Sequence, residues 1–327
     1  MGRQDKASPV SPTPTLLTVP TAFIINPAAG GGRVGRRLHD ITRAVRDDGS
    51  SSRSILVTQG TGHARELARE VAAAHATVVA VGGDGTVSEV ARGLVDSDSD
   101  ARLGIIPLGT GNDLAHALRI PRGFKAAVAV LGQGSVLKID YGKIRIVDGN
   151  GERESVFVNA VGAGLDAEIA GAVQGHKALP GYVGYGLAAL RTVADWRSVP
   201  VRLSAIGADG VGRTWAGRCV LVTVGNGPRS GGGFHLTPDA VVSDGRLDVC
   251  IVKEASRRRV IAMLPLALTG RHVGAREVLT WRVVELEMEA SETIAVHADG
   301  ELLAQQAESV RISIVPEGMR VVAPPRL

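Results

Sequence analysis

Short apolar runs alternate with helical spacings along the first third of the chain. Each run is long enough for one buried strand, and the stretches between them repeat apolar residues every three or four positions, as in a helix packed on one face. We expect strands at 21–27, 53–58, 77–81 and 102–109, and helices at 33–48, 63–75 and 86–95. This alternation predicts a parallel sheet covered by helices, with every turn from strand to helix on one edge of the sheet.

Beyond residue 138 the hydrophobic pattern changes to a period of two, which is typical of strands with one buried face. Such segments lie at 154–162, 201–207, 218–226, 246–254, 282–290 and 309–318, and one helix is expected at 181–196. Gly, Asp and Asn separate the segments, as in β-turns. The sequence therefore predicts an α/β domain with a parallel sheet, followed by a mostly antiparallel β domain.

The length of 327 residues suits two domains. A charged, proline-containing start predicts a disordered leader without a signal peptide. We divide the chain into the leader (1–18), the α/β domain (19–138), the β-rich domain (139–302) and a C-terminal segment (303–327) that can return to the first domain.

Composition narrows the classes of function. Aromatic residues make up 3% of the chain, too few for stacking platforms, so no nucleic-acid partner is expected. The net charge of +4 includes basic clusters at 33–37 and 257–259, which suit either a solvated face or weak attraction to an anionic membrane. Cys219 and Cys250 have no further ligand at metal spacing, so we expect buried thiols in the cytoplasm. The longest apolar run, 260–268, is too short to span a bilayer.

Three glycine-rich turns follow expected strands of the first domain. Their sequences are NPAAGGGRVG (26–35), GGDGT (82–86) and PLGTGNDLA (107–115). Glycine lets backbone amides approach an anion, and the N-terminus of a following helix attracts it. Each turn alone has an ordinary structural explanation, but three on one sheet edge favour a nucleoside triphosphate site. Asp84 and Asp113 within these turns require a divalent cation or an arginine between them and phosphate.

Other nucleotide-binding motifs fit the chain less well. Gly30, Gly32 and Gly35 have the spacing of a dinucleotide fingerprint, but the second strand ends in Thr58 and Gln59, where NAD-binding proteins carry an acidic residue. The chain contains no Walker A sequence, which excludes a P-loop NTPase.

The motif GGDGTVSE (82–89) is similar to the nucleotide-binding motif shared by diacylglycerol kinases, sphingosine kinases and NAD kinases, and more distantly by phosphofructokinases. NPAAGGG and PLGTGNDLA narrow the resemblance to the lipid kinases. The second domain extends it through VGNGPRSGGGF (224–234), TPDAVVSDGRLDV (237–249) and HADGE (297–301). From about residue 20 to its end the chain resembles a soluble bacterial diacylglycerol kinase. The resemblance implies ATP and Mg²⁺ as cofactors and a lipid substrate met at the membrane surface.

The same resemblance implies roles for individual residues. Positions that bind ATP in the family, or lie beside it, match Asn26, Pro27, Ala28, Ala29, Gly30, Thr58, Gly82, Gly83, Asp84, Gly85, Thr86, Val87, Ser88, Glu89, Thr110, Asn112 and Asp113. The catalytic base falls on Asp299, with Glu301 beside it, and Asp84 would serve the magnesium that bridges phosphate oxygens. Without the resemblance, ADGE is also an ordinary β-turn sequence.

Two further acidic positions and one departure follow from the resemblance. A structural magnesium would be held by Asp244 and the backbone carbonyls of Val241 and Arg246, and Asp140 would join Asp84 and Asp113 around the catalytic cleft. The family usually has an arginine after GNDLA, where this chain has His116. Either the charge network is altered, or Arg119, one turn further on, takes that place.

We expect an ATP-dependent lipid kinase that phosphorylates the primary hydroxyl of diacylglycerol or a similar lipid, located in the cytoplasm with peripheral membrane association. An NAD kinase shares GGDGT but does not account for PLGTGNDLA. A catalytically silent lipid-binding or regulatory protein would tolerate the loss of Asp84 or Asp299, and both are present. An oligomer is compatible with the sequence.

Overall fold

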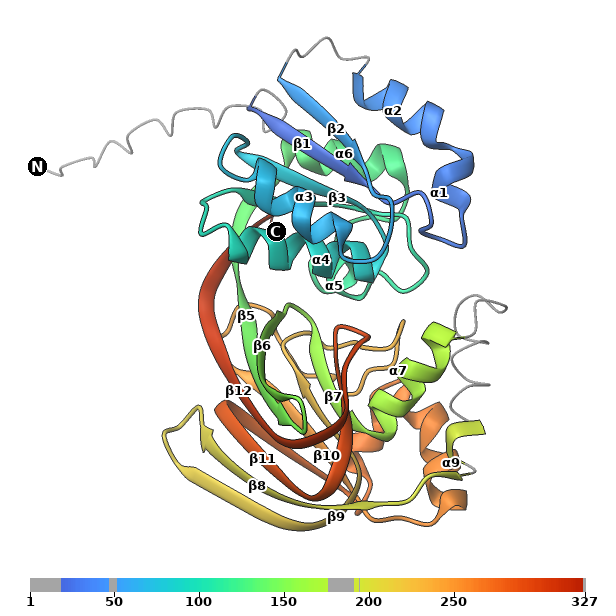
Figure 1. Cartoon of the computed structure of the whole chain (residues 1–327), viewed down its shortest axis with the longest axis vertical. Coiled ribbons are helices and arrows are strands. Elements are labelled where there is room, and N and C mark those ends of the chain that lie inside the picture. Colours follow the sequence, from blue (N-terminus) through green and yellow to red (C-terminus); the bar gives the residue numbers. More distant parts are fainter. Residues whose placement is uncertain (1–18, 47–51, 176–190, 194, 326–327) are drawn as a thin grey trace, which may run out of the picture.

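The computed structural model describes residues 19–46, 52–175, 191–193 and 195–325. The leader predicted at 1–18 and most of the helix predicted at 181–196 lie outside these residues. Figure 1 shows an upper lobe built from the first part of the chain and a lower lobe rich in strands. Across the described residues, no helix is both long and apolar enough to cross a lipid bilayer.

The upper lobe alternates strands and helices. Its elements are β1 (Thr21–Ile25), α1 (Arg33–Arg36), α2 (Leu38–Arg46), β2 (Arg53–Val57), α3 (His63–Val71), β3 (Thr77–Gly82), α4 (Asp84–Asp96), β4 (Arg102–Pro107), α5 (Asp113–Ala117) and α6 (Phe124–Gln133). Strands β4, β3, β1 and β2 pair in that order, and every pairing is parallel. The helix predicted at 33–48 is two helices that meet at Arg37.

The lower lobe is mostly antiparallel. Its elements are β5 (Ser135–Asp148), β6 (Gly151–Phe157), β7 (Ala160–Gly164), α7 (Leu165–Gly175), β8 (Val199–Gly207), β9 (Gly212–Gly225), β10 (Leu247–Lys253), α9 (Arg257–Ala267), the 3₁₀ turn η2 (Arg271–Gly274), β11 (Val278–Ala298) and β12 (Glu301–Ala323). Strand pairs within this lobe are antiparallel. The fold class expected from the sequence, a parallel α/β domain followed by a mostly antiparallel β domain, is confirmed.

Two long strands, β5 and β12, run side by side from one lobe into the other (Figure 1). Near its end β12 also pairs in parallel with β4, through Val321 and Leu103. One twelve-stranded sheet therefore continues through both lobes. The backbone hydrogen bonds of this sheet continue from one lobe to the other. The strands therefore fix the position of the upper sheet relative to the lower lobe.

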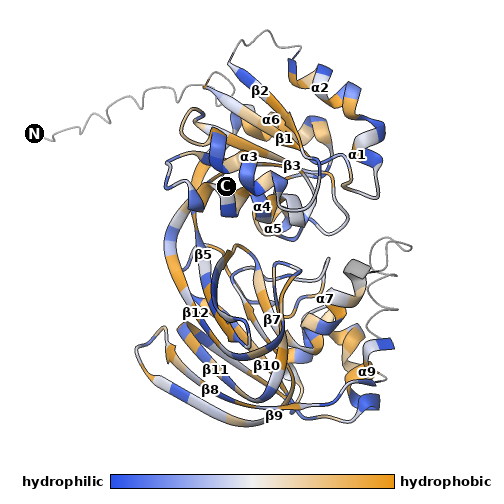
Figure 2. Ribbon diagram, in the orientation of Figure 1, coloured by the Kyte–Doolittle hydropathy of each residue, from blue (hydrophilic) through white to orange (hydrophobic). Residues whose placement is uncertain are grey.

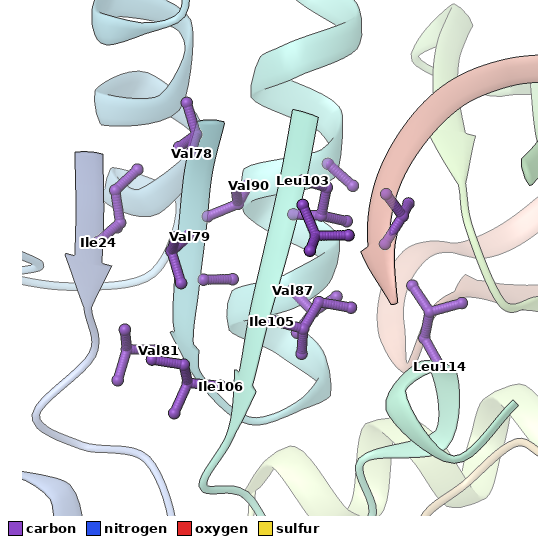
Figure 3. Packing of buried hydrophobic residues seen from close by; sticks show 14 of the residues in the cluster. Ile24, Val78, Val79, Val81, Val87, Val90, Leu103, Ile105, Ile106 and Leu114 are labelled. Atoms are coloured by element: carbon purple, nitrogen blue, oxygen red, sulfur yellow. The ribbon is translucent and has the colours of Figure 1, made fainter. Parts of the chain in front are cut away.

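The core of the upper lobe follows from the continuous apolar runs. Every residue of β1 and β3 is buried, and both strands are coloured as hydrophobic in Figure 2. Val87 and Val90 of α4 pack against this sheet together with Leu103 and Ile105 of β4 (Figure 3). Burial of each such side chain contributes about 1.5–3 kcal/mol. This packing fixes the position of α4, whose first turn carries the GGDGT motif.

Helix α4 also packs closely on α3 at a position that only glycine allows. A Cβ atom on Gly93 would lie 2.3 Å from the backbone oxygen of Arg65 and 2.7 Å from the Cβ of Ala68. Gly85, in the same helix, would place a Cβ atom in open space.

These two glycines provide a matched test of the packing. Gly93→Ala should lower the free energy of unfolding by about 1–3 kcal/mol, because the added methyl group forces the helices apart. Gly85→Ala should leave it unchanged or raise it by up to about 1 kcal/mol, because alanine favours the helix. Urea unfolding followed by circular dichroism measures both. Equal effects of the two substitutions would contradict the close contact between α3 and α4.

Candidate active site

A pocket of about 330 Å³ lies between the lobes and is lined by both. The upper lobe contributes Asp84, Val87, Ser88, Thr110, Gly111, Asp113 and Leu114, and the lower lobe contributes Val158, Asn159, Ala170, Ser230, Gly231, Gly232, His297, Asp299 and Gly300. Residues more than 200 positions apart in the sequence thus face the same space. Five residues predicted from the sequence as ATP-binding (Asp84, Val87, Ser88, Thr110 and Asp113) meet the predicted base, Asp299, here.

The second and third glycine turns touch each other through their backbones. A Cβ atom on Gly109 would lie 2.3 Å from the Cα of Gly83. On Gly82 it would lie 2.4 Å from the hydroxyl of Thr86, and this hydroxyl in turn accepts a hydrogen bond from the Asn26 side chain at 3.0 Å. These glycines are therefore required for packing, and they draw the three turns together at one edge of the sheet.

The first glycine turn is built differently. Gly30, Gly31 and Gly32 have φ angles of 62°, 67° and 78°, a left-handed conformation that side chains rarely adopt. Gly31 has open space where a Cβ atom would lie. Arg33, Arg36 and Arg37 line a neighbouring pocket of about 290 Å³ together with Leu108. An exposed backbone flanked by arginines is suited to an anion.

Asp84 bridges the second and third turns. Its carboxylate accepts hydrogen bonds from the backbone amides of Asn112, at 2.7 Å, and Asp113, at 2.5 Å. These amides belong to the N-terminal end of α5, where a negative charge is favourable. Burial, opposed by these hydrogen bonds, raises the pKa of Asp84.

Asp113 links the upper lobe to the lower lobe through a hydrogen bond and an ion pair. Its Oδ2 accepts a hydrogen bond from the Gly232 amide at 2.9 Å, and its Oδ1 lies 3.5 Å from Nε of Arg229. Both side chains of this ion pair are at most 6% exposed. Burial, followed by the negative charge of Asp84, raises the pKa of Asp113 to about 7. The pocket therefore holds two carboxyl groups, and burial makes the ionised form of each one unfavourable.

Asp299 is held by donors from both lobes. It lies in the turn between β11 and β12 and has a left-handed φ of 51°. Ser88 of α4 donates its hydroxyl to Oδ2 at 2.8 Å. The backbone amides of Val158, Asn159 and Ala160 donate at 2.9–3.0 Å. Each carboxylate oxygen of Asp299 accepts two hydrogen bonds, which fixes the direction of this side chain into the pocket.

Glu301, predicted beside the base, is directed elsewhere. Its carboxylate forms an ion pair with Arg92 of α4 and does not line the pocket. Arg92 is 4% exposed and also donates to the carbonyls of Val156 and Ala298. The pair ties the β11–β12 turn to the upper lobe. Arg92 was not predicted from the sequence, because an arginine in a helical segment usually faces solvent.

A buried His–Asp pair supports the same turn and was also missed. Nε2 of His297 lies 3.3 Å from a carboxylate oxygen of Asp166, and both side chains are 2% exposed. The Gly300 amide donates to Nδ1 of His297 at 3.2 Å, and Thr223 donates to Asp166 at 3.0 Å. A Cβ atom on Gly162 would lie 2.2–2.3 Å from both side chains of the pair. In the sequence, only the motif HADGE (297–301), identified through the resemblance, indicated that His297 lies near the site.

Several predicted nucleotide residues lie outside the pocket lining. Glu89 accepts hydrogen bonds from the amides of Gly62 and Ala64 at the start of α3. Thr58 is buried at the end of β2, with its amide bonded to Ile25. Asn112 closes the third turn by exchanging two hydrogen bonds with Gly109 at 3.0 Å. The remaining residues of this set, Asn26, Pro27, Ala28, Ala29, Gly30, Gly82, Gly83, Gly85 and Thr86, form the two turns beside the pocket.

The arginine that faces the cleft carboxylates comes from the second lobe. Both His116 and Arg119 have exposed side chains, and Asp113 pairs with Arg229 instead. The idea that Arg119 takes the place of the usual arginine is therefore not supported. Arg229 belongs to the segment GNGPRSGGG, 116 residues further along the chain.

The loop predicted to hold a structural metal is supported by Asp140. This aspartate is 1% exposed and accepts hydrogen bonds from the amides of Gly245 and Glu317, each at 2.7 Å. It therefore braces the loop and does not line the pocket. The predicted ligands, Asp244 and the carbonyls of Val241 and Arg246, are all oxygens, the type that magnesium or calcium prefers, and this metal site stays a prediction. Within the described residues, no three His, Cys, Asp or Glu side chains cluster as metal ligands.

Family models match both lobes. The "Diacylglycerol kinase catalytic domain" matches residues 20–144, and the "YegS C-terminal NAD kinase beta sandwich-like domain" matches residues 159–323. A "Probable lipid kinase YegS-like" from Pseudomonas aeruginosa is 34% identical over 83% of this chain and 84% of its own length. A "Diacylglycerol kinase" from Mycobacterium tuberculosis is 30% identical over 57% of each chain.

Solved structures agree in fold. A diacylglycerol kinase from Bacillus anthracis superimposes with a TM-score of 0.69 at 22% identity, over 94% of this chain and 98% of that one. Yeast NADH kinase complexed with NADH gives a TM-score of 0.56 at 11% identity, over 97% of this chain and 89% of that one. Together with the matched motifs and relatives, these findings show that the chain belongs to the lipid kinase family that joins a diacylglycerol kinase catalytic domain to a YegS-type C-terminal β-sandwich domain.

Proposed function

We propose that the protein transfers the γ-phosphoryl group of ATP to the primary hydroxyl of diacylglycerol or a similar lipid, in the pocket between the lobes. The observation that carries this proposal is the meeting of Asp299 with Asp84 and Asp113 around one space. Phosphoryl transfer requires positioned groups and neutralised charge more than covalent help from the protein. In this cleft the carboxylate of Asp299 is fixed on one wall, and the glycine-rich turns on the other wall would bind phosphate. The cleft would therefore supply both positioned groups and neutralised charge.

The glycine turns would hold the triphosphate. The N-terminus of α4, at the second turn, points its free amides at the sheet edge, where a helix favours an anion. The open backbone at Gly31 and the arginines at 33, 36 and 37 lie beside that edge. These groups orient the nucleotide, so that only its terminal phosphate needs to reach the pocket.

The carboxylates of the upper lobe fit a magnesium ion. Oδ1 of Asp113 and the side-chain oxygen of Asn159 are both buried and accept no hydrogen bond from the described residues. Oxygens of this kind are the ligands that magnesium prefers, directly or through water. Asp84, Asp113 and Asn159 would hold the ion, which when bound neutralises phosphate charge in the transition state.

Asp299 is our candidate for the general base. Its four acceptor sites are filled, three of them by backbone amides that cannot leave. The fourth donor, the Ser88 hydroxyl, can rotate away and free one lone pair of Oδ2 for the lipid hydroxyl. The proton of that hydroxyl then passes to Oδ2, its oxygen bonds to the γ-phosphorus, and the bond from the γ-phosphorus to ADP breaks.

The assay that tests the function offers labelled ATP and magnesium to the full chain with diacylglycerol in mixed micelles, and with NAD in a parallel reaction. Label in phosphatidic acid supports the proposal. Label in NADP would identify an NAD kinase, the alternative function. Yeast NADH kinase is similar to this chain in fold. Label in neither product, with ATP bound, would favour a catalytically silent relative.

Asp299→Asn tests the base directly. The variant should lose about 10²–10⁴ of kcat, because the asparagine side chain takes no proton, while its Kd for ATP changes by less than about threefold. Ser88→Ala is the matched control. It removes only the displaceable donor and should retain kcat within about tenfold. Single-turnover kinetics and equilibrium binding separate the two quantities, and equal losses of kcat and ATP affinity in Asp299→Asn would contradict its role as base.

The raised pKa of Asp113 predicts a pH-dependent stability. The metal-free folded protein holds this proton up to a pKa of about 7, whereas the unfolded chain releases it near 3.9. Between these values the folded state therefore loses stability as the pH rises. The unfolding free energy of wild type minus that of Asp113→Asn should fall by about 2.5 kcal/mol from pH 5 to pH 8.

Chemical unfolding in a chelating buffer at several pH values measures this difference. A difference for Asp113→Asn that stays constant from pH 5 to pH 8 would show that the buried carboxylate does not titrate in this range.

A further inference from the structure

One segment of the lower lobe carries an excess of positive charge. The whole chain has 37 basic and 33 acidic residues. Residues 253–277, which contain α9 and η2, have six basic and two acidic residues, a net charge of +4. A second stretch with the same excess, residues 33–46, belongs to the upper lobe and flanks the first glycine turn. In the lower lobe the excess coincides with one helix and the turn after it, which calls for an explanation beyond overall solubility.

The first turn of α9 is unusually cationic. Arg257, Arg258 and Arg259 occupy it, and it contains no acidic residue. Positive charges at a helix N-terminus oppose the helix dipole, so this arrangement does not serve the stability of the helix. Arg259 pairs with Glu277 at 3.0 Å, a carboxylate that Arg276 shares. Arg257 and Arg258 are exposed, and neither forms an ion pair with a residue in the described part of the chain.

Apolar side chains continue the same outer face of the helix. Ile261 is 42% exposed and Leu268 is 41% exposed, which places both among the large hydrophobic side chains left exposed on the described surface. Pro265 is exposed between them. The spacing from 258 through 261 and 265 to 268 follows one face of a helix. The opposite face, with Val260, Met263 and Ala267, is buried, so packing within the lobe does not require the outer apolar residues.

The buried face of α9 and helix α7 belong to one hydrophobic cluster of the lower lobe. Val260 and Met263 share this cluster with Leu165 and Ile169 of α7, and Figure 1 shows α7 and α9 on the same side of the lower lobe. Helix α7 begins at Leu165, next to Asp166, which pairs with the pocket residue His297. The lobe that carries the outer face of α9 therefore also carries one wall of the pocket.

We propose that the outer face of α9, formed by Arg257, Arg258, Ile261, Pro265 and Leu268, docks on an anionic phospholipid bilayer. Cations at one end of the face meet lipid phosphates, and the apolar residues enter the boundary of the acyl chains, as in interfacial helices. The proposal deepens the proposed function, since a lipid substrate resides in a membrane. Binding to vesicles nevertheless tests it without any catalytic step.

A second exposed apolar surface provides the matched control. Ile206 on β8 is 46% exposed and Val211 in the following turn is 56% exposed. The charges beside them, Asp209 and Arg213, pair with each other at 2.6 Å and leave no excess that would attract anionic lipid. Both surfaces contain exposed hydrophobic residues, but they differ in net charge.

The test is sedimentation of the full chain with vesicles of phosphatidylcholine, alone or with about 30 mol% phosphatidylglycerol. Wild type should bind the anionic vesicles at least about tenfold more tightly, and salt should weaken that binding. Arg257→Gln with Arg258→Gln should weaken it by about 30-fold, from the loss of two cations at the surface. Ile261→Ser should weaken it by about tenfold without changing its salt dependence. Circular dichroism verifies the fold of each variant.

Arg202 of β8 is exposed and lies opposite Glu289 of β11. The control, Ile206→Ser with Arg202→Gln, should bind like wild type. The docking proposal is overturned if the α9 variants bind as tightly as wild type, or if the β8 variant loses binding in their place. The proposed function fails by a different result. If wild type binds anionic vesicles but transfers no phosphate to lipid in micelles, the proposed lipid kinase activity is contradicted. The docking proposal is not affected by that result.

Discussion

An ionised carboxylate inside a protein is stable only where hydrogen-bond donors replace the water that it has lost. The aspartates at 84, 113, 140 and 299 meet this requirement with backbone amides from distant segments. Each bond fixes a carboxylate and at the same time ties two parts of the chain together. Asp299 shows the effect most clearly, since it receives donors from α4 and from residues 158–160. The site and the junction of the lobes are therefore one structure.

The balance of charge in the pocket follows from the same constraint. Asp84 and Asp113 lie together, and the buried Arg229 and the exposed Arg122 supply positive charge near Asp113. Burial nevertheless raises the pKa of both carboxyl groups. A free triphosphate would add negative charge next to the two aspartates, and a divalent cation bound with it would offset that charge. The cleft would therefore favour a metal–nucleotide complex over the free nucleotide.

Features with a local physical cause could be predicted from the sequence. The buried strands are continuous apolar runs, and the glycine turns follow them because each parallel strand ends at the same sheet edge. Contacts between distant segments could not be predicted in this way. The sequence offered Arg119, one turn after His116, as an arginine for the cleft aspartates, whereas Asp113 pairs with Arg229 in the other lobe. Arg92 and Glu301, 209 residues apart, leave no periodic pattern in the sequence that would predict their ion pair. The roles assigned to individual site residues remain predictions that rest on the resemblance and on this geometry.

The central claim is that a nucleotide held by the upper lobe presents its γ-phosphate to Asp299 of the lower lobe. A crystal structure of the full chain with a non-hydrolysable ATP analogue and magnesium tests it most directly. The account predicts the terminal phosphate in the pocket lined by Asp84, Thr110 and Asp299, with the metal next to Asp84 and Asp113. A nucleotide bound with its terminal phosphate outside this pocket, and no metal between it and these aspartates, would contradict the account.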